Sequence, residues 1–130
     1  MNLPDTPALL YQATSRLNKT SDTPALDAEL LFCAVCGIDR SAVTTDQSLA
    51  LTNRQVDVFS TLINRRAAGE PIAYLLQRKE FWSQDLLVSP EVLIPRPETE
   101  LLVEQALENL PDQPCNVADL GTGSGAIALA

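Results

Sequence analysis

Residues 117–130 decide the fold of the C-terminal part of this chain, and they read Val117-Ala118-Asp119-Leu120-Gly121-Thr122-Gly123-Ser124-Gly125-Ala126-Ile127-Ala128-Leu129-Ala130. A short apolar run ends in an acid, glycines follow at every second position, and an alanine-rich apolar run then begins. This order predicts a buried β-strand over residues 116–120, a tight glycine turn and the start of a helix. It is typical of the beginning of an α/β nucleotide-type domain.

The glycine turn is a candidate binding site, because glycine lets the backbone approach a ligand closely and free N–H groups at a helix start attract an anion. One interpretation is a turn that binds nothing. A second is a dinucleotide site, because Gly121-x-Gly123-x-x-Ala126 satisfies the dinucleotide fingerprint in its alanine form. The carboxylate of Asp119 argues against this interpretation, since it would repel a pyrophosphate.

A third interpretation, S-adenosylmethionine, fits Asp119 better. This cofactor has no phosphate, its ammonium and sulfonium groups are attracted to an acid, and its carboxylate can accept hydrogen bonds from backbone N–H groups. An acid to bind the ribose hydroxyls is expected about 20 residues further on, which would place it beyond Ala130. We expect cofactor contacts from Asp119, Gly121, Thr122, Gly123, Ser124 and Gly125.

The composition excludes several other functions. The net charge of −8 opposes binding to a phosphate backbone, so we expect no direct contact with nucleic acid. The N-terminus has no signal-peptide pattern and no run is long enough to span a membrane, so we expect a cytoplasmic protein without membrane contact. Histidine is absent, which removes Ser-His-Asp and Cys-His catalysis and imidazole metal sites.

Cys33-x-x-Cys36 has the spacing of a redox or zinc motif. Gly37, however, is typical of the residue that follows a helix, so both thiols would lie in a last helical turn. The helix dipole disfavours a thiolate there, and no second Cys-x-x-Cys supplies further zinc ligands. We therefore expect no metal site, and two reduced thiols that act as small apolar residues.

The first 70 residues predict a bundle of three to five short helices. Thr6-Pro7 and Thr23-Pro24 are start signals, in each case a capping residue before a proline at the first helical position. The second helix would end at Gly37, and Thr52 with Gln55 fits a capping box that begins a further helix. Residues 40–46 are ambiguous and are compatible with a short helix. Asp27 and Arg66 read as charges that complement the helix dipoles.

A β-hairpin is predicted next, with strands at 80–82 and 86–88 and a turn at 83–85. Residues 94–97 are extended because a residue before proline avoids the α region, and Pro97 can begin a helix. In that helix we expect one apolar face, made by Leu101, Leu102, Ala106, Leu107 and Leu110. A helix start alone would explain Pro97, but Arg96 between two prolines has no evident folding role. We include Arg96, Glu98 and Thr99 among the cofactor-pocket candidates.

Several of these segments together resemble one family. They are Glu70-Pro71-Ile72-Ala73-Tyr74-Leu75, Glu80-Phe81-Trp82, Leu93-Ile94-Pro95-Arg96-Pro97-Glu98-Thr99-Glu100 and Asp119-Leu120-Gly121-Thr122-Gly123-Ser124-Gly125, in this order. The chain resembles the N-terminal part of the bacterial release factor glutamine methyltransferases, the HemK/PrmC family. The proline-containing segment at 93–100 is specific to this family, whereas the glycine loop occurs in methyltransferases generally. Gln77 departs from the pattern, because relatives usually have glycine there, and it would be strained if that position needs a positive φ.

The resemblance implies a helical release-factor-recognition domain over 1–70, a hairpin linker over 71–95 and the incomplete start of a Rossmann-like methyltransferase domain over 96–130. It implies methyl transfer from S-adenosylmethionine to the side-chain amide nitrogen of the glutamine in the Gly-Gly-Gln loop of peptide-chain release factors. The family's catalytic Asn-Pro-Pro-Tyr motif would lie beyond Ala130, so we expect no catalytic residue and no activity in this chain, and a monomer. The alternatives are a nicotinamide-dinucleotide domain and an inactive protein-binding module.

Overall fold

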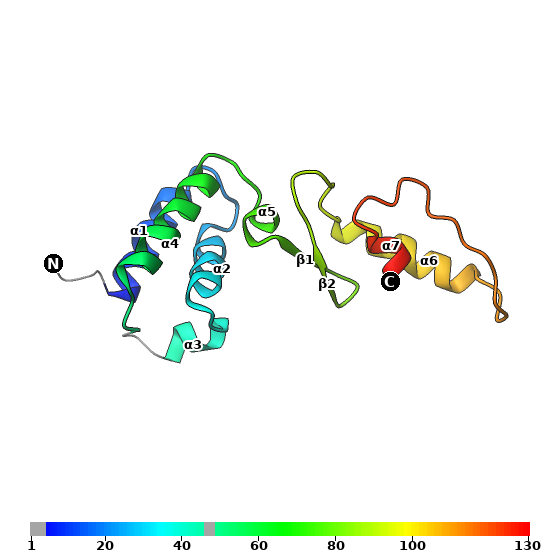
Figure 1. Cartoon of the computed structure of the whole chain (residues 1–130), viewed down its shortest axis with the longest axis horizontal. Helices are drawn as coiled ribbons and strands as arrows, with labels where there is room; N and C mark the ends of the chain where they lie inside the picture. Colours follow the sequence, from blue (N-terminus) through cyan, green and yellow to red (C-terminus); the bar gives the residue numbers. More distant parts are fainter. Residues whose placement is uncertain (1–4, 46–48) are drawn as a thin grey trace. The chain divides into compact units, whose positions relative to one another are not determined.

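The computed structural model describes residues 5–45 and 49–130. The chain divides into two compact units, with the boundary between Leu76 and Gln77. The first unit is helical (Figure 1), and its elements are α1 (Thr6–Leu17), α2 (Pro24–Cys36), α3 (Arg40–Thr45), α4 (Asn53–Ala67) and α5 (Ile72–Leu76). The second contains the hairpin strands β1 (Arg78–Phe81) and β2 (Gln84–Leu87), the 3-10 turn η1 (Pro97–Thr99), and helices α6 (Glu100–Asn109) and α7 (Ala126–Leu129).

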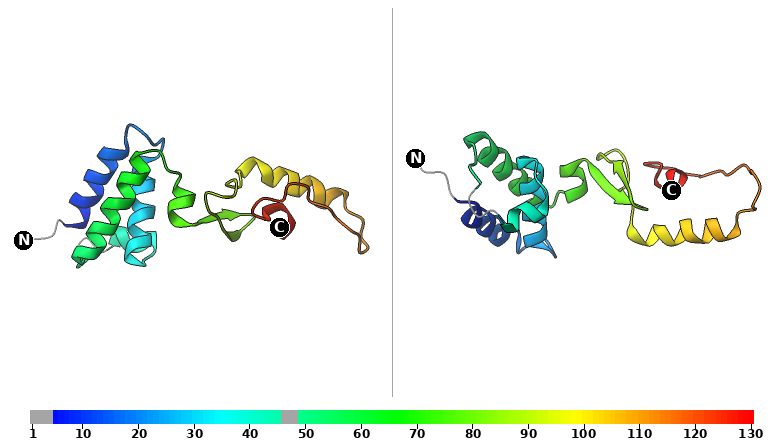
Figure 2. Two further views of the ribbon diagram at one scale, coloured as in Figure 1. Left: turned by 45° about the horizontal axis from the view of Figure 1, so that its top comes forward. Right: turned by 90° about the horizontal axis from the view of Figure 1, so that it is seen from below.

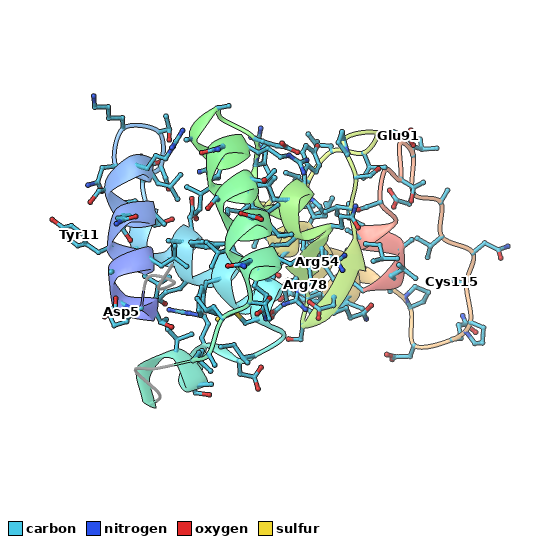
Figure 3. All side chains as sticks on the ribbon, turned by 60° about the vertical axis from the view of Figure 1, so that its left-hand side comes forward. Asp5, Tyr11, Arg54, Arg78, Glu91 and Cys115 are labelled. Atoms are coloured by element: carbon cyan, nitrogen blue, oxygen red, sulfur yellow. The ribbon has the colours of Figure 1, made fainter. Side chains whose placement is uncertain are left out.

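The helix boundaries follow local signals, with one correction at the start of α1. Its capping residue is Asp5, which Figure 3 labels at the start of the helix. The Oδ1 atom of Asp5 accepts a hydrogen bond from the N–H of Ala8 at 3.0 Å. The expected cap, Thr6, lies inside the helix instead, where its buried hydroxyl has no hydrogen-bond partner among the described residues. Proline is accepted at the first or second helical position, so Pro7 is equally compatible with either start.

Most of the other expected helix signals are confirmed, although Thr23, the residue before α2, makes no side-chain capping hydrogen bond. Thr52 and Gln55 form the capping box of α4: the Thr52 hydroxyl accepts from the Gln55 N–H at 3.2 Å, and the Gln55 side chain accepts from the Thr52 N–H at 2.9 Å. Gly37 ends α2 with a φ of 67°, a left-handed conformation that suits glycine. The short helix expected near residue 40 is α3, and Asp46 lies outside the described residues. Helix α5 was not predicted, although Pro71 begins it by accepting from the N–H groups of Tyr74 and Leu75.

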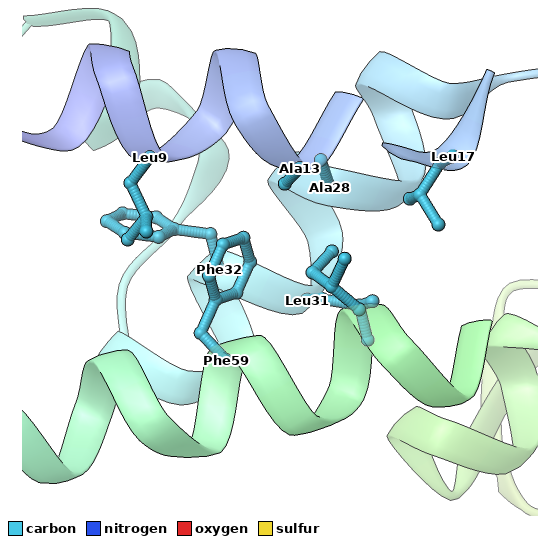
Figure 4. Close-up of a cluster of buried hydrophobic side chains, with 8 residues drawn as sticks. Leu9, Ala13, Leu17, Ala28, Leu31, Phe32 and Phe59 are labelled. Carbon is cyan, nitrogen blue, oxygen red and sulfur yellow. The ribbon is translucent and has the colours of Figure 1, made fainter. Parts of the chain in front are cut away.

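Helices α1, α2 and α4 lie side by side and enclose the core of the first unit (Figures 1 and 2). Phe32 of α2 and Phe59 of α4 meet edge to face at its centre, with ring centroids 5.6 Å apart (Figure 4). Leu17 and Leu31 are completely buried beside them. This core is made by residues before the unit boundary, so the helices have their own source of stability.

The predicted hairpin is confirmed, but its turn is shorter than expected. Strand β1 pairs with β2 so that Phe81 lies opposite Gln84, which leaves only Trp82 and Ser83 in the turn. Trp82 was therefore wrongly placed in a strand, and Gln84 and Asp85 were wrongly placed in the turn. Val88, expected in the second strand, directly follows β2. In the observed register Phe81 and Leu86 share one face of the hairpin, where both are buried. Because a shift by one residue would expose this apolar pair, the core selects the shorter turn.

Helix α6 does not bury the apolar face that we expected. The exposed fractions of its leucines are 61% for Leu101, 56% for Leu102, 54% for Leu107 and 40% for Leu110. Val103 is buried instead, against the hairpin and α7. Side-chain periodicity identified the helix correctly but did not identify the side of it that packs in this structure.

The strand predicted at 116–120 is wrong for this structure. These residues have no regular conformation, and Val117 and Leu120 are 71% and 92% exposed. The hairpin is the one sheet in the described part of the chain, and it is antiparallel. A strand needs a neighbour to accept and donate its backbone hydrogen bonds, and residues 116–120 have none. The chain is thus rich in helix with a small antiparallel sheet, and α7 follows the glycine loop without a preceding strand.

Candidate functional site: the glycine loop and its supports

The glycine loop has a backbone that only glycine adopts readily. Gly121, Gly123 and Gly125 have φ angles of 74°, 55° and 81°, all in the left-handed region. The loop is closed by a hydrogen bond of 2.8 Å from the N–H of Gly125 to the carbonyl of Thr122. The occurrence of glycine at every second position therefore has a conformational cause.

Open space lies beside two of these glycines. A Cβ atom built on Gly121 would meet nothing within 4 Å, and one on Gly123 would meet only the carbonyl oxygen of Gly121, at 4.0 Å. A Cβ on Gly125 would lie 3.6 Å from the side chain of Leu129. A ligand could thus approach the backbone at Gly121 and Gly123, whereas Gly125 faces the helix that follows it. Close approach of a cofactor to Gly123 stays a prediction.

Asp119 contributes an unsatisfied carboxylate oxygen to this site. Its Oδ2 is shielded from solvent and has no hydrogen-bond partner within the described ranges 5–45 and 49–130. A shielded oxygen without a partner is unfavourable, because its lost hydration is not replaced. A bound cationic or N–H-bearing group would supply the missing partner.

The residues Arg96, Glu98 and Thr99 lie directly before α6, in and next to the 3-10 turn η1. Arg96 precedes η1 with an extended backbone, and its carbonyl accepts from the N–H of Thr99 at 3.0 Å. The side chains of Arg96 and Glu98 are exposed and that of Thr99 is half-buried. No hydrogen bond or ion pair joins these three residues to the glycine loop in the part of the chain that the structure describes.

The hairpin forms hydrogen bonds next to both candidate segments, residues 96–99 and the glycine loop. The residues that form these bonds were not among the predicted site residues. The Oε1 atom of Glu100, directly after Thr99, accepts from the backbone N–H of Trp82 at 2.8 Å. The Nε2 atom of Gln84 donates to the carbonyl of Leu129, at the end of α7, at 2.9 Å. These contacts span 18 and 45 residues, so no local pattern could have revealed them.

The Cys33 and Cys36 thiols are unpaired in this structure. Burial raises the pKa of both above its ordinary value of 9.0, and the negative charge of Glu29 raises the pKa of Cys33 further. Protonated thiols are weak nucleophiles and weak metal ligands. Among the described residues, no three His, Cys, Asp or Glu side chains gather as a metal site would require.

Within the described residues, no helix combines the length and apolar character needed to cross a membrane.

Comparison with known proteins assigns the family. The PrmC N-terminal domain family matches residues 8–76, which is more than half of the chain. The release factor glutamine methyltransferase of Escherichia coli K12 is 51% identical over 121 residues, and that of Coxiella burnetii is 52% identical over 118 residues. These alignments cover 93% and 90% of this chain but 43% of each relative, so the chain spans less than half the length of the relatives it matches. The chain belongs to the PrmC N-terminal domain family.

Proposed function

We propose that this chain supplies the substrate-docking part and the first cofactor loop of an enzyme that methylates release factors. The reaction would transfer a methyl group from S-adenosylmethionine to the side-chain amide nitrogen (N5) of the glutamine in their Gly-Gly-Gln loop. One observation carries the proposal: about half of the residues are identical to release factor glutamine methyltransferases over nearly the whole chain. The protein would act in the cytoplasm as a monomer, without direct contact with nucleic acid or membrane.

The proposal assigns a task to each part of the chain. Residues 1–70 would recognise the release factor, and residues 96–130 would begin the Rossmann-like cofactor domain. Residues 71–95 would link these two domains. The separate core of the helices supports a distinct docking domain. Residues 116–120 would become a strand once neighbouring strands pair with them, and their exposed Val117 and Leu120 are suited to burial there.

The glycine loop would hold the cofactor by complementary charge and close approach. Asp119 would accept a hydrogen bond from the cofactor ammonium, while N–H groups from Gly121 to Ser124 would donate to the carboxylate of the cofactor. Bound S-adenosylmethionine supplies a methyl group on a positively charged sulfur. The open sides of Gly121 and Gly123 and the unpaired oxygen of Asp119 support this arrangement. Thr122 and Ser124 complete the loop, and Arg96, Glu98 and Thr99 would line the pocket.

A dinucleotide site is the alternative for the same loop, and the Asp119 carboxylate disfavours it. A protein-binding module without activity is the alternative for the helices. Because the chain spans 43% of the E. coli relative, we would test binding in a chimera in which this chain replaces the matching 121 residues of that enzyme. We expect the chimera to bind S-adenosylmethionine, but not NAD, by calorimetry, and to add one methyl group to a release factor glutamine by mass spectrometry.

A Gly123→Val variant of the chimera should lose cofactor binding, because its side chain would fill the approach space and strain the loop. Gly37→Val is the matched control, since it introduces the same strain at φ 67° in the helical unit. Loss of cofactor affinity in both variants, or in neither, would remove the loop from the site. An unmodified release factor together with normal cofactor binding would favour the protein-binding alternative.

A further inference from the structure

The hairpin turn is conformationally strained. Trp82 and Ser83 have φ angles of 51° and 57°, and a type I′ hairpin turn requires positive φ at both of its central residues. Asn-Gly is the sequence that usually occupies such a turn, because other side chains are strained there. A strained backbone persists only where its surroundings hold it.

Glu100 is positioned to hold this turn. A turn residue at the position of Trp82 has no partner for its N–H group in the ladder between the two strands. The Glu100 carboxylate supplies that partner at 2.8 Å, in a partly buried position. Hydrogen bonds to a charged acceptor are stronger than those between neutral groups. The Trp82 side chain packs against the cluster of Phe81, Leu86, Val103 and Ala126, which adds a second restraint.

The same hairpin holds the end of the glycine loop. Gln84, the residue after the turn, donates to the carbonyl of Leu129 in α7. Ala126, the first residue of α7, is 7% exposed and belongs to the same buried cluster as Phe81 and Val103. Since α7 begins directly after Gly125, a displacement of the hairpin would move the end of the glycine loop as well.

We propose that Glu100 is a positioning residue of the cofactor pocket. Its carboxylate holds the strained turn onto the start of α6, and the hairpin in turn holds α7, so one side chain sets the spacing between residues 96–99 and the glycine loop. The assignment to a cofactor pocket rests on the proposed function. The positional role itself belongs to the folded chain and can be measured without a cofactor.

The test uses the ¹⁵N-labelled chain and three variants: Glu100→Ala, Glu100→Gln and, on the same helix, Glu104→Ala. In Glu100→Ala we expect hydrogen exchange of the Trp82 amide to become at least about tenfold faster. We also expect the fluorescence of Trp82, the one tryptophan of the chain, to change, and amide shifts to move from residue 121 to residue 129. Glu100→Gln keeps a side-chain carbonyl acceptor and should restore most of these properties. Glu104→Ala, which removes an exposed acid of the same helix, should change none of them.

Two outcomes would overturn the proposal. In the first, the Trp82 amide exchanges at the same rate in Glu100→Ala as in the wild type. In the second, Trp82 is released while the amides of 121–129 keep their shifts, so that Glu100 only caps the turn. If Glu100→Ala unfolds the hairpin, the additional change Ser83→Gly would relieve strain in the turn without restoring the carboxylate. In this double variant the glycine loop should still be displaced. A glycine loop in its wild-type position would contradict the positioning role of Glu100. Failure of the chimera to bind S-adenosylmethionine would refute the proposed function and leave these amide measurements unaffected.

Discussion

The carboxylate of Asp27 accepts a hydrogen bond from Nε of Arg66 at 2.7 Å, and the two side chains are only 7% and 17% exposed. The hydroxyl of Ser21 donates to the same oxygen of Asp27, also at 2.7 Å. Arg66 further donates to the carbonyl of Glu70 at 3.3 Å. One buried ion pair thus joins the start of α2 to the end of α4, which are 39 residues apart in the sequence.

We predict that Arg66→Met destabilises the helical unit by about 3 kcal/mol, because it leaves a buried carboxylate without its counter-ion. The double variant Asp27→Leu, Arg66→Met should recover most of this loss, since it removes both charges. Urea unfolding followed by circular dichroism measures both effects. Arg65→Met is the matched control: its partner Glu70 is in an exposed pair, so stability should change little. Equal losses for Arg65→Met and Arg66→Met would contradict the special role of the buried pair.

Gln77 has a φ of 56°, so the strain expected from a non-glycine residue there is present in the structure. Gln77→Gly should stabilise the second unit by about 0.5 kcal/mol, because relief of roughly 1 kcal/mol of strain is partly offset by the greater freedom of glycine in the unfolded chain. Gln77→Val should destabilise it, since a β-branched side chain tolerates this region poorly. The carbonyl of Gln77 accepts from the N–H of Val88, so exchange of that amide reports both changes. Faster exchange in the glycine variant would show that the position is not strained.

The raised pKa values of Cys33 and Cys36 predict slow alkylation. At pH 8, iodoacetamide should modify the exposed Cys115 first, as peptide mass spectrometry would show. Folding raises the pKa of the buried Cys33 thiol and of the half-buried Cys36 thiol, so the folded chain holds their protons more tightly than the unfolded chain. Their contribution to stability is therefore complete below the ordinary value of 9.0 and is lost as the pH rises above it. Rapid modification of Cys33 at pH 8 would contradict this account.

The chain by itself should not methylate a release factor and should bind S-adenosylmethionine weakly or not at all. Its 130 residues contain no Asn-Pro-Pro-Tyr motif, and residues 116–120 lack the neighbouring strands that would wall a cofactor pocket. Titration calorimetry on the isolated chain is the measurement. Micromolar affinity, or any methylation of a release factor, would mean that the candidate residues already form a complete site.

The parts of this protein that the sequence predicted correctly depend on neighbouring residues. The capping box of Thr52 and Gln55, the terminal glycine Gly37 and the helix start at Pro97 are all local, because each signal acts within one helical turn. The glycine loop was predictable for the same reason, since its left-handed backbone requires the glycines themselves. The family resemblance rested on short segments in a fixed order, and the comparisons confirmed the family.

The tertiary structure decided what depends on residues that are distant in the sequence. From the sequence, Asp27 and Arg66 were interpreted as charges that complement two separate helix dipoles, whereas in the folded chain they form one buried ion pair. The turn at Trp82 and Ser83 follows from burial of Phe81 and Leu86, and Glu100 was overlooked because its partner lies 18 residues earlier. Residues 116–120 have the pattern of a strand but no neighbour to pair with. Hydrophobic pattern and local propensity specify which conformation a segment favours, whereas its contacts with distant segments decide whether that conformation forms.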